Sequence, residues 1–145
     1  MSASTLSAAV APHGETSTSW PAGVRRVGAF LMVAGLAFVL LALEAPNVLA
    51  MLYDLAASAG TVTDMGASTR FGAALFGALT FGWGVTLDQL GRGRDPGRAC
   101  TVGMLAWFAV DSGASVVSGY GWNAVSNLGF AVIVLVLLRT APSRS

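Results

Sequence analysis

Four long runs of apolar residues, separated by polar connections, dominate the pattern along the chain. They cover about residues 24–43, 71–90, 99–117 and 122–138. Each run has roughly 17–20 residues, the length that a helix needs to cross the hydrocarbon core of a bilayer. The runs are continuous and lack the alternation of a barrel strand. The pattern therefore predicts an all-α integral membrane protein, with residues 24–139 forming a four-transmembrane-helix bundle.

The segments outside these runs differ in character. Residues 1–23 are rich in Ser, Thr, Ala and Gly and show no periodicity, so we expect a disordered cytoplasmic tail there. Residues 140–145 form a second, short cytoplasmic tail. The connection between the first two runs contains the stretch PNVLAMLYDLAASAG, which begins with Pro-Asn and carries apolar residues at helical spacing. This stretch predicts a short interfacial helix in the first outer loop.

Composition supports the membrane assignment and excludes several other classes. Hydrophobic residues make up 54% of the chain and charged residues only 10%, against about 25% charged in a soluble domain. The net charge is +1, and the eight basic residues are all arginines without a basic stripe, so nucleic acid is not an expected partner. Cys100 is the single cysteine, which excludes an intrachain disulfide and a cysteine-based metal cluster. The expected partner is the lipid bilayer, and we expect neither a metal nor a cofactor.

The arginines indicate how the chain is oriented. Seven of the eight fall before the first run, between the second and third, or after the fourth: Arg25, Arg26, Arg92, Arg94, Arg98, Arg139 and Arg144. With four spans these regions share one side of the membrane, which the positive-inside rule makes the cytoplasm. Both termini are then cytoplasmic, in the inner membrane of a cell of bacterial type. Asp88 and Asp95 are expected to pair with the neighbouring arginines at this surface.

A carboxylate inside the third run is the strongest candidate for function. Asp111 shares one helix face with Ser115, four residues further on, and Asn123 and Asn127 share a face of the fourth run. The two runs are joined by the very short turn SGYG, so they form a tight antiparallel hairpin. Counting outward from the turn places Asp111 level with Asn127, and Ser115 level with Asn123. The two polar stripes are therefore expected to meet on the outer side.

Six residues are candidates for binding a ligand or a proton: Asp111, Ser112, Ser115, Asn123, Asn127 and Arg70. Arg70, at the start of the second span, is the one arginine on the outer side and is a candidate counter-ion for Asp111. Ionisable residues within membrane spans are costly and often functional. The stripe has two readings: a polar clamp between two helices, or a pocket that binds a small solute, a proton or a lipid headgroup. The second is favoured, because a charge is an expensive clamp.

Glycine is frequent, with 18 residues in the chain, and much of it lies in the spans. In the second span, Ala74, Ala78 and Gly82 recur at intervals of four, and Gly28 and Gly35 stand seven apart in the first. Small residues at this spacing let helix backbones approach closely. They predict packing within the bundle in preference to a homodimer face.

The sequence favours no enzyme class, and no catalytic residue is assigned. It contains no HExxH, no GxSxG and no phosphate-binding loop. The four spans resemble the small multidrug-resistance transporters in overall plan, a family whose essential carboxylate lies in the middle of the first span. Here Glu44 lies at the outer end of the first span and the buried acid lies in the third, so no motif of that family matches residue by residue.

Three functions therefore stay open. The first is binding or translocation of a small solute or proton through the outer-side polar site of Asp111. The second is an accessory or assembly subunit of a larger membrane complex. The third is a small membrane-embedded isomerase or cyclase that uses one carboxylate. The first reading predicts a homodimer, and the second predicts a larger partner.

Overall fold

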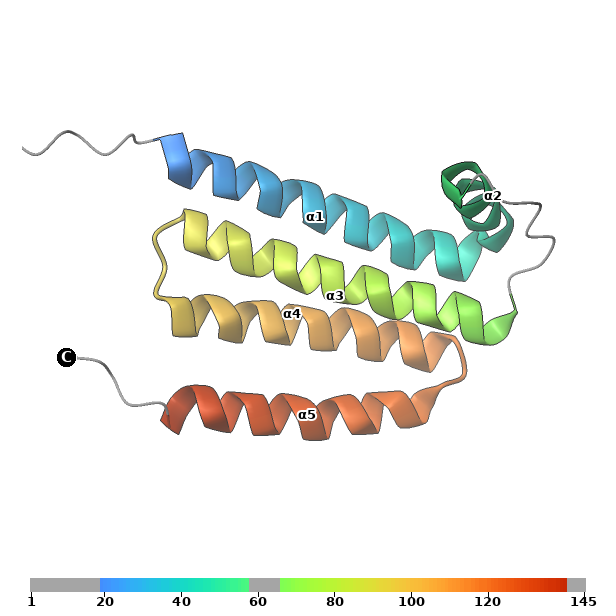
Figure 1. Cartoon of the computed structure of the whole chain (residues 1–145). Coiled ribbons are helices and arrows are strands. Elements are labelled where there is room, and N and C mark those ends of the chain that lie inside the picture. The colour runs from blue at the N-terminus through green and yellow to red at the C-terminus, as the bar shows by residue number, and fades with distance from the viewer. Residues whose placement is uncertain (1–18, 58–65, 141–145) are drawn as a thin grey trace, which may run out of the picture.

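The computed structural model describes residues 19–57 and 66–140, and these ranges fold into helices without any strand. The helices are, in chain order, α1 (Ser19–Glu44), α2 (Pro46–Ala57), α3 (Ala67–Gly91), α4 (Pro96–Val117) and α5 (Gly121–Thr140) (Figure 1). All except α2 are long and apolar enough to cross a membrane. The prediction of an all-α bundle with four membrane-spanning helices is therefore confirmed.

The long helices extend beyond the apolar runs that predicted them. The first begins at Ser19, five residues before the predicted span, and the second long helix begins at Ala67 rather than Phe71. Backbone hydrogen bonding continues into the polar region at the membrane surface, whereas the hydrocarbon core sets only the minimum apolar length. Residues 1–18 and 141–145, which make up most of the two predicted tails, lie outside the described residues, as do residues 58–65.

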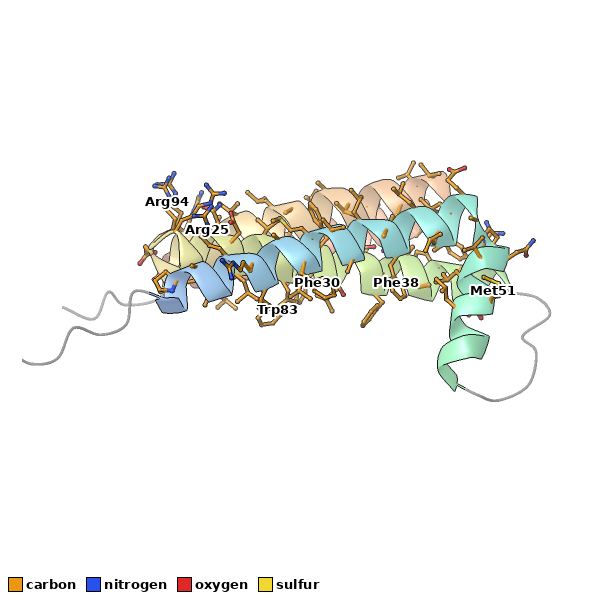
Figure 2. All side chains as sticks on the ribbon, turned by 90° about the horizontal axis from the view of Figure 1, so that it is seen from above. Arg25, Phe30, Phe38, Met51, Trp83 and Arg94 are labelled. Carbon is orange, nitrogen blue, oxygen red and sulfur yellow. The ribbon has the colours of Figure 1, made fainter. Side chains whose placement is uncertain are left out.

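The helices pack in the order in which they follow one another along the chain. α1 packs on α3, α3 on α4, and α4 on α5, with successive long helices antiparallel (Figure 1). α3 and α5 lie on either side of α4 and have little direct contact. The short helix α2, predicted as an interfacial helix, is present; it lies at one end of the bundle and projects sideways from the end of α1 (Figures 1 and 2). We call this the α2 end, and the opposite end, where Arg25 and Arg94 gather, the arginine end (Figure 2).

Glycines bring the backbones of α1 and α3 into direct contact. A Cβ atom added at Gly35 would lie 2.6 Å from the carbonyl oxygen of Gly77, and one at Gly84 would lie 2.7 Å from that of Gly28. Such approaches leave no room for any side chain. In lipid, where apolar side chains gain little by leaving the solvent, van der Waals contact of this kind holds helices together. The predicted role of Gly28 and Gly35 in packing within the bundle is confirmed.

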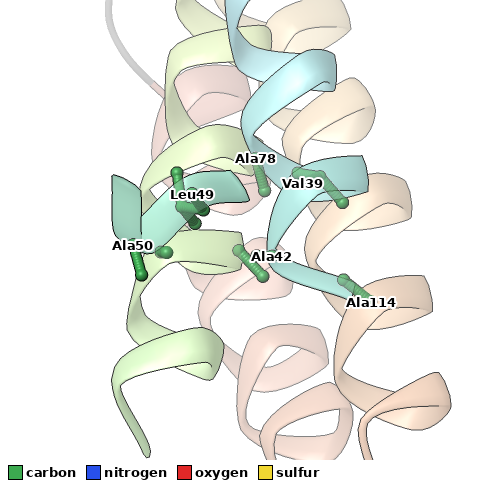
Figure 3. Packing of buried hydrophobic residues seen from close by; sticks show 8 residues of the cluster. Val39, Ala42, Leu49, Ala50, Ala78 and Ala114 are labelled. Atoms are coloured by element: carbon green, nitrogen blue, oxygen red, sulfur yellow. The ribbon is translucent and has the colours of Figure 1, made fainter. Parts of the chain in front are cut away.

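The interior of the bundle is made mostly of small side chains. The buried cluster at the α2 end contains Ala42, Ala78 and Ala114 from three different long helices (Figure 3). Leu49 of α2 is a fully buried large side chain in this cluster and attaches α2 to the spans. Large apolar side chains face outward instead: Phe30 is 68% exposed (Figure 2). A surface of this kind suits contact with lipid tails.

Two of the connections are closed by the same glycine-based motif. After α4, Gly119 adopts φ +83°, its N–H donates to the carbonyl of Val116, and the N–H of Tyr120 donates to that of Ser115. After α3, Gly93 has φ +71° and the same pair of hydrogen bonds. This is the Schellman motif, in which glycine takes the left-handed conformation that other residues rarely adopt. It reverses the chain within a few residues and makes neighbouring spans antiparallel.

Charged residues at the arginine end follow the sequence prediction in part. Asp88 accepts a 2.7 Å hydrogen bond from Nε of Arg92 and lies 3.7 Å from Nε of Arg25. The bond to Asp88 raises the pKa of the Arg92 guanidinium above its ordinary value. The predicted pairing of Asp95 with an arginine side chain is wrong. Both ion pairs in the described ranges involve Asp88. Oδ1 of Asp95 instead accepts the backbone N–H of Arg98 at 3.0 Å, so that this carboxylate caps the first turn of α4.

The close contact of α1 with α3 predicts the effect of adding a single methyl group. Gly35→Ala should lower the stability by about 1–3 kcal/mol, because the new Cβ meets backbone atoms that cannot move aside. Gly72→Ala is the matched control, since no atom lies within 4 Å of a Cβ at that position. Its stability should stay unchanged or rise by up to about 1 kcal/mol. Thermal unfolding in mild detergent checks both variants, and equal melting of the two would contradict the packing described above.

Candidate functional site

Four polar side chains meet between α4 and α5, near the α2 end. Asp111 and Ser115 lie one turn apart on α4, and Asn123 and Asn127 lie one turn apart on α5. Asp111 is 3% exposed, Ser115 is fully buried and Asn127 is 7% exposed. The tight turn after Val117 fixes the register of the two helices, so the two polar faces oppose each other. Polar groups at such positions must find partners inside the protein, because lipid offers none.

Both contacts predicted from the register are present. Nδ2 of Asn127 donates to Oδ2 of Asp111 at 2.9 Å. Nδ2 of Asn123 donates to Oγ of Ser115 at 2.8 Å. Each hydrogen bond of this kind between membrane helices is worth on the order of 0.6 kcal/mol. The four residues therefore form a connected polar cluster across the α4–α5 interface.

The carboxylate of Asp111 receives fewer hydrogen bonds than it can accept. The hydroxyl of Ser115 has a single proton, which it donates to the backbone carbonyl oxygen of Asp111 at 2.7 Å. Oγ of Ser115 also lies 3.4 Å from Oδ1 of Asp111, and no proton is left for that contact. Asn123 reaches the same Oδ1 only at 3.3 Å. A carboxylate offers about four acceptor positions, and one of them is filled by a short bond, from Asn127. The site is thus rich in acceptors and short of donors.

Two further candidates contribute little to this cluster. Ser112 is in contact with Asn127, whose Nδ2 lies 3.5 Å from its hydroxyl oxygen, at the limit of a hydrogen bond. Arg70 lies in the first turn of α3, and its Nε is buried without a partner among the described residues. Both ion pairs found in the described ranges involve Asp88, so the geometry does not bring Arg70 into an ion pair with Asp111.

An open groove begins at the polar cluster and runs toward the arginine end. Its volume is about 620 Å³, and α4 forms its floor between α3 and α5. Asp111, Asn123 and Asn127 line one end, and Cys100 lies at the other. The rest of the lining comes from Leu75, Phe76, Leu79, Gly82, Trp83, Thr86, Gly103, Met104, Trp107 and Phe130. The polar cluster is therefore one end of a larger and mostly apolar site.

Sequence reasoning found the polar end of this site and missed the groove. Trp107 lies four residues before Asp111 and therefore on the same helix face, and this spacing is the one signal in the sequence that extends the polar site along α4. In the structure its ring packs edge-on against Phe130, with 5.7 Å between ring centroids. The wall from α3 has no comparable signal. It exists because α3 and α5 stand apart on either side of α4, which a pattern of single residues does not encode.

The chemistry that these side chains support is hydrogen bonding and, at most, proton exchange at one carboxylate. In residues 19–57 and 66–140, no group of three His, Cys, Asp or Glu side chains is placed to hold a metal ion. The amide groups of Asn123 and Asn127 and the carboxylate of Asp111 can each accept a hydrogen bond from a guest in the groove. The arrangement is suited to holding a donor-bearing group.

Comparison with known proteins adds no relative from which a role could be transferred. No protein-family model, no curated protein and no solved structure matches this chain. The arrangement of Asp111 and its neighbours therefore carries the functional argument by itself.

Proposed function

We propose that this multi-pass membrane protein binds a small solute or a proton at the polar site formed by Asp111, Ser115, Asn123 and Asn127. The observation that carries the proposal is the unfilled acceptor capacity of the buried Asp111 carboxylate at the end of an open groove. A guest with N–H or O–H groups would fill that capacity. Translocation of the same guest across the membrane is compatible with the site and would need a second, differently open conformation.

A purely structural clamp explains this site less well. Hydrogen bonds between α4 and α5 could be made equally by a neutral amide or hydroxyl at position 111, at a lower cost of burial. Burying a carboxylate at a helix centre costs about 2.5–3.5 kcal/mol on insertion scales. A clamp would also be expected to fill the acceptor positions of the carboxylate with short bonds, and here Asn127 donates at 2.9 Å and Asn123 only at 3.3 Å. A carboxylate with acceptor positions left over at the end of a groove supports binding.

The distribution of arginine supports the proposed orientation, with both termini in the cytoplasm and the protein in the inner membrane of a bacterial-type cell. Arg25, Arg92 and Arg94 all lie at the arginine end, opposite α2. The site would then lie in the outer half of the bilayer. Asp111 lies six residues before Val117, the last residue of α4, or about 9 Å below the turn at 1.5 Å per residue.

The accessory-subunit hypothesis loses part of its basis. An accessory subunit would need a face that can dock a larger partner, and glycine-rich helix faces are suited to such docking. The glycines Gly28, Gly35, Gly77 and Gly84 are already occupied by the contact between α1 and α3. The same contact removes the main support for a homodimer through these faces. Solute binding is therefore the function that we favour.

Exchange of the carboxylate for an amide tests whether Asp111 is kept for binding. Asp111→Asn should raise the stability by about 1 kcal/mol, because functional residues are often retained at the expense of stability. The amide keeps an oxygen that can accept the bond from Asn127 and removes a buried charge. Thermal unfolding of the empty protein in mild detergent measures the change.

The same substitution at Asp88, an acidic residue in the part of α3 near the arginine end, is the control. Asp88→Asn removes a partner of Arg25 and Arg92 and should lower the stability by about 0.2–1 kcal/mol, as for other exposed pairs. A clear loss of stability in Asp111→Asn as well would identify Asp111 as a clamp and would overturn the proposal.

Asparagine side chains provide a direct readout of binding. The chain has three asparagines, of which Asn123 and Asn127 lie in the site and Asn47 lies on α2. In protein labelled with isotope-enriched asparagine and placed in lipid nanodiscs, n-butylamine should shift the side-chain amide signals of Asn123 and Asn127. The signal of Asn47 should not move, because α2 packs on α1 and Asn47 does not line the groove.

The variant Asp111→Leu provides the specificity control for this titration. It keeps the branched shape of the side chain, with methyl groups in place of the two oxygens, and removes the acceptor, so the shifts of Asn123 and Asn127 should disappear. Shifts of equal size in the variant, or no shift in the native protein up to saturating amine, would exclude a donor-binding site at Asp111.

A further inference from the structure

We infer that the ligand of this protein is a single-chain amphiphile, with a hydrogen-bond donor as its head and a linear hydrocarbon chain as its tail. The head would contact Asp111, and the chain would lie along α3 and α4 toward Cys100. This inference rests on the proposed function, because it assigns the chemical class of the guest at the same polar site. It adds the apolar part of the groove, which binding of a small solute leaves unused.

The distribution of polar atoms along the groove supports a guest with one polar end. Asp111, Asn123 and Asn127 are together at one end of the lining. Further along, the hydroxyl of Thr86 donates to the carbonyl of Gly82 in its own helix and is not free to bind a guest. The remaining lining is almost entirely apolar. A guest that was polar throughout would lose its hydration here without gaining partners.

The length of the groove suits a medium hydrocarbon chain. Along α4 the lining extends from Cys100 to Asp111, eleven residues or about 16 Å at 1.5 Å per residue. Along α3 it covers a stretch of the same length, from Leu75 to Thr86. This is roughly half of the 30 Å hydrocarbon core of a bilayer. A chain in the groove would therefore run parallel to the lipid tails of the surrounding membrane.

The volume of the groove suits a small molecule. It is about 620 Å³, within the range of about 300–1,000 Å³ that is usual for small-molecule sites.

The chemistry of the head follows from the acceptors at the polar end. The Asp111 carboxylate has unfilled acceptor positions, and no cation pairs with it among the described residues. An amine or a hydroxyl supplies the missing donor, whereas a carboxylate head would bring a second acceptor and a like charge. The shared requirement is an N–H or O–H group at the end of an apolar chain.

The single cysteine of the chain gives a readout at the far end of the groove. Cys100 is exposed, lines the groove and lies in the second turn of α4, close to the arginine end. A chain that fills the groove should shield its thiol from N-ethylmaleimide. The test measures the rate of alkylation by mass spectrometry, on the full chain in lipid nanodiscs. A dodecyl chain is about 14 Å long with carbon–carbon bonds of about 1.5 Å, which is long enough to approach Cys100 from Asp111.

Four probes with the same chain separate the possible modes of recognition. Dodecylamine and dodecanol each carry a donor and should slow alkylation about tenfold at ten times their dissociation constant, when about a tenth of the sites are empty. Dodecyltrimethylammonium has the charge of the amine without an N–H, and dodecanoate is an acceptor with the charge of Asp111. Neither of these two should protect Cys100.

Two adjacent residues of α4 provide matched variants. Met104→Trp places a larger side chain in the lining of the groove and should abolish protection by dodecylamine. Leu105→Trp makes the same kind of change at a neighbouring position, 47% exposed and outside the lining, and should leave protection intact. Each variant is compared with itself with and without amphiphile, so that a change in its basal alkylation rate does not matter.

The outcomes separate this inference from the proposed function. If butylamine shifts the signals of Asn123 and Asn127 and no dodecyl probe protects Cys100, the polar site binds a small solute, and the inference of an amphiphilic ligand is wrong. If neither butylamine nor dodecylamine moves those signals, the proposed function is wrong, and the inference falls with it. Protection by dodecyltrimethylammonium equal to that by dodecylamine, without protection by dodecanol, would show recognition of charge alone and would overturn the requirement for a donor.

Discussion

The register between α4 and α5 decides what the polar residues of this protein can do. The turn at residues 118–120 reverses the chain within three residues because Gly119 takes a left-handed conformation. That reversal places Asn127 against Asp111 and Asn123 against Ser115. Each added residue would rotate α5 by about 100° relative to α4, and the buried carboxylate would lose its one short hydrogen bond. An acidic residue at this depth has hydrogen-bond partners on α5 because the turn is so short.

The helix α3 packs closely against α1 and less closely against α4, and the groove results from this difference. Toward α1 it presents Gly77 and Gly84, and the two backbones touch along most of their length. Toward α4 it presents Gly82, which approaches Gly103 and Trp107, while Leu79 and Trp83 project past the contact and form one wall of the groove. Small residues thus close one interface completely, and larger ones hold open the space beside the other.

The sequence was sufficient for those parts of the structure that depend on local periodicity or on the length of a turn. Span length, the short helix α2 and the pairing of Asp111 with Asn127 all follow from such regularities. Asp95 was assigned the wrong partner, because the choice between a backbone N–H and a guanidinium depends on geometry at the helix start. The groove was missed for a different reason: it depends on how far α3 and α5 stand from each other, and neither helix encodes that distance alone.

The last span is attached to the protein by an unusually narrow set of contacts. α5 packs on α4 alone among the long helices, apart from marginal contacts, and its buried residues are Asn127 and Ala131. Its association in the membrane therefore depends on a few amide hydrogen bonds and one aromatic contact, whereas α1 and α3 are joined along their backbones. The contact between α5 and the rest of the bundle is thus the weakest contact between long helices, and it lies beside the groove. A molecule that contacted both α3 and α5 would bridge that contact, and the assembled state of the whole bundle would become linked to occupancy of the groove.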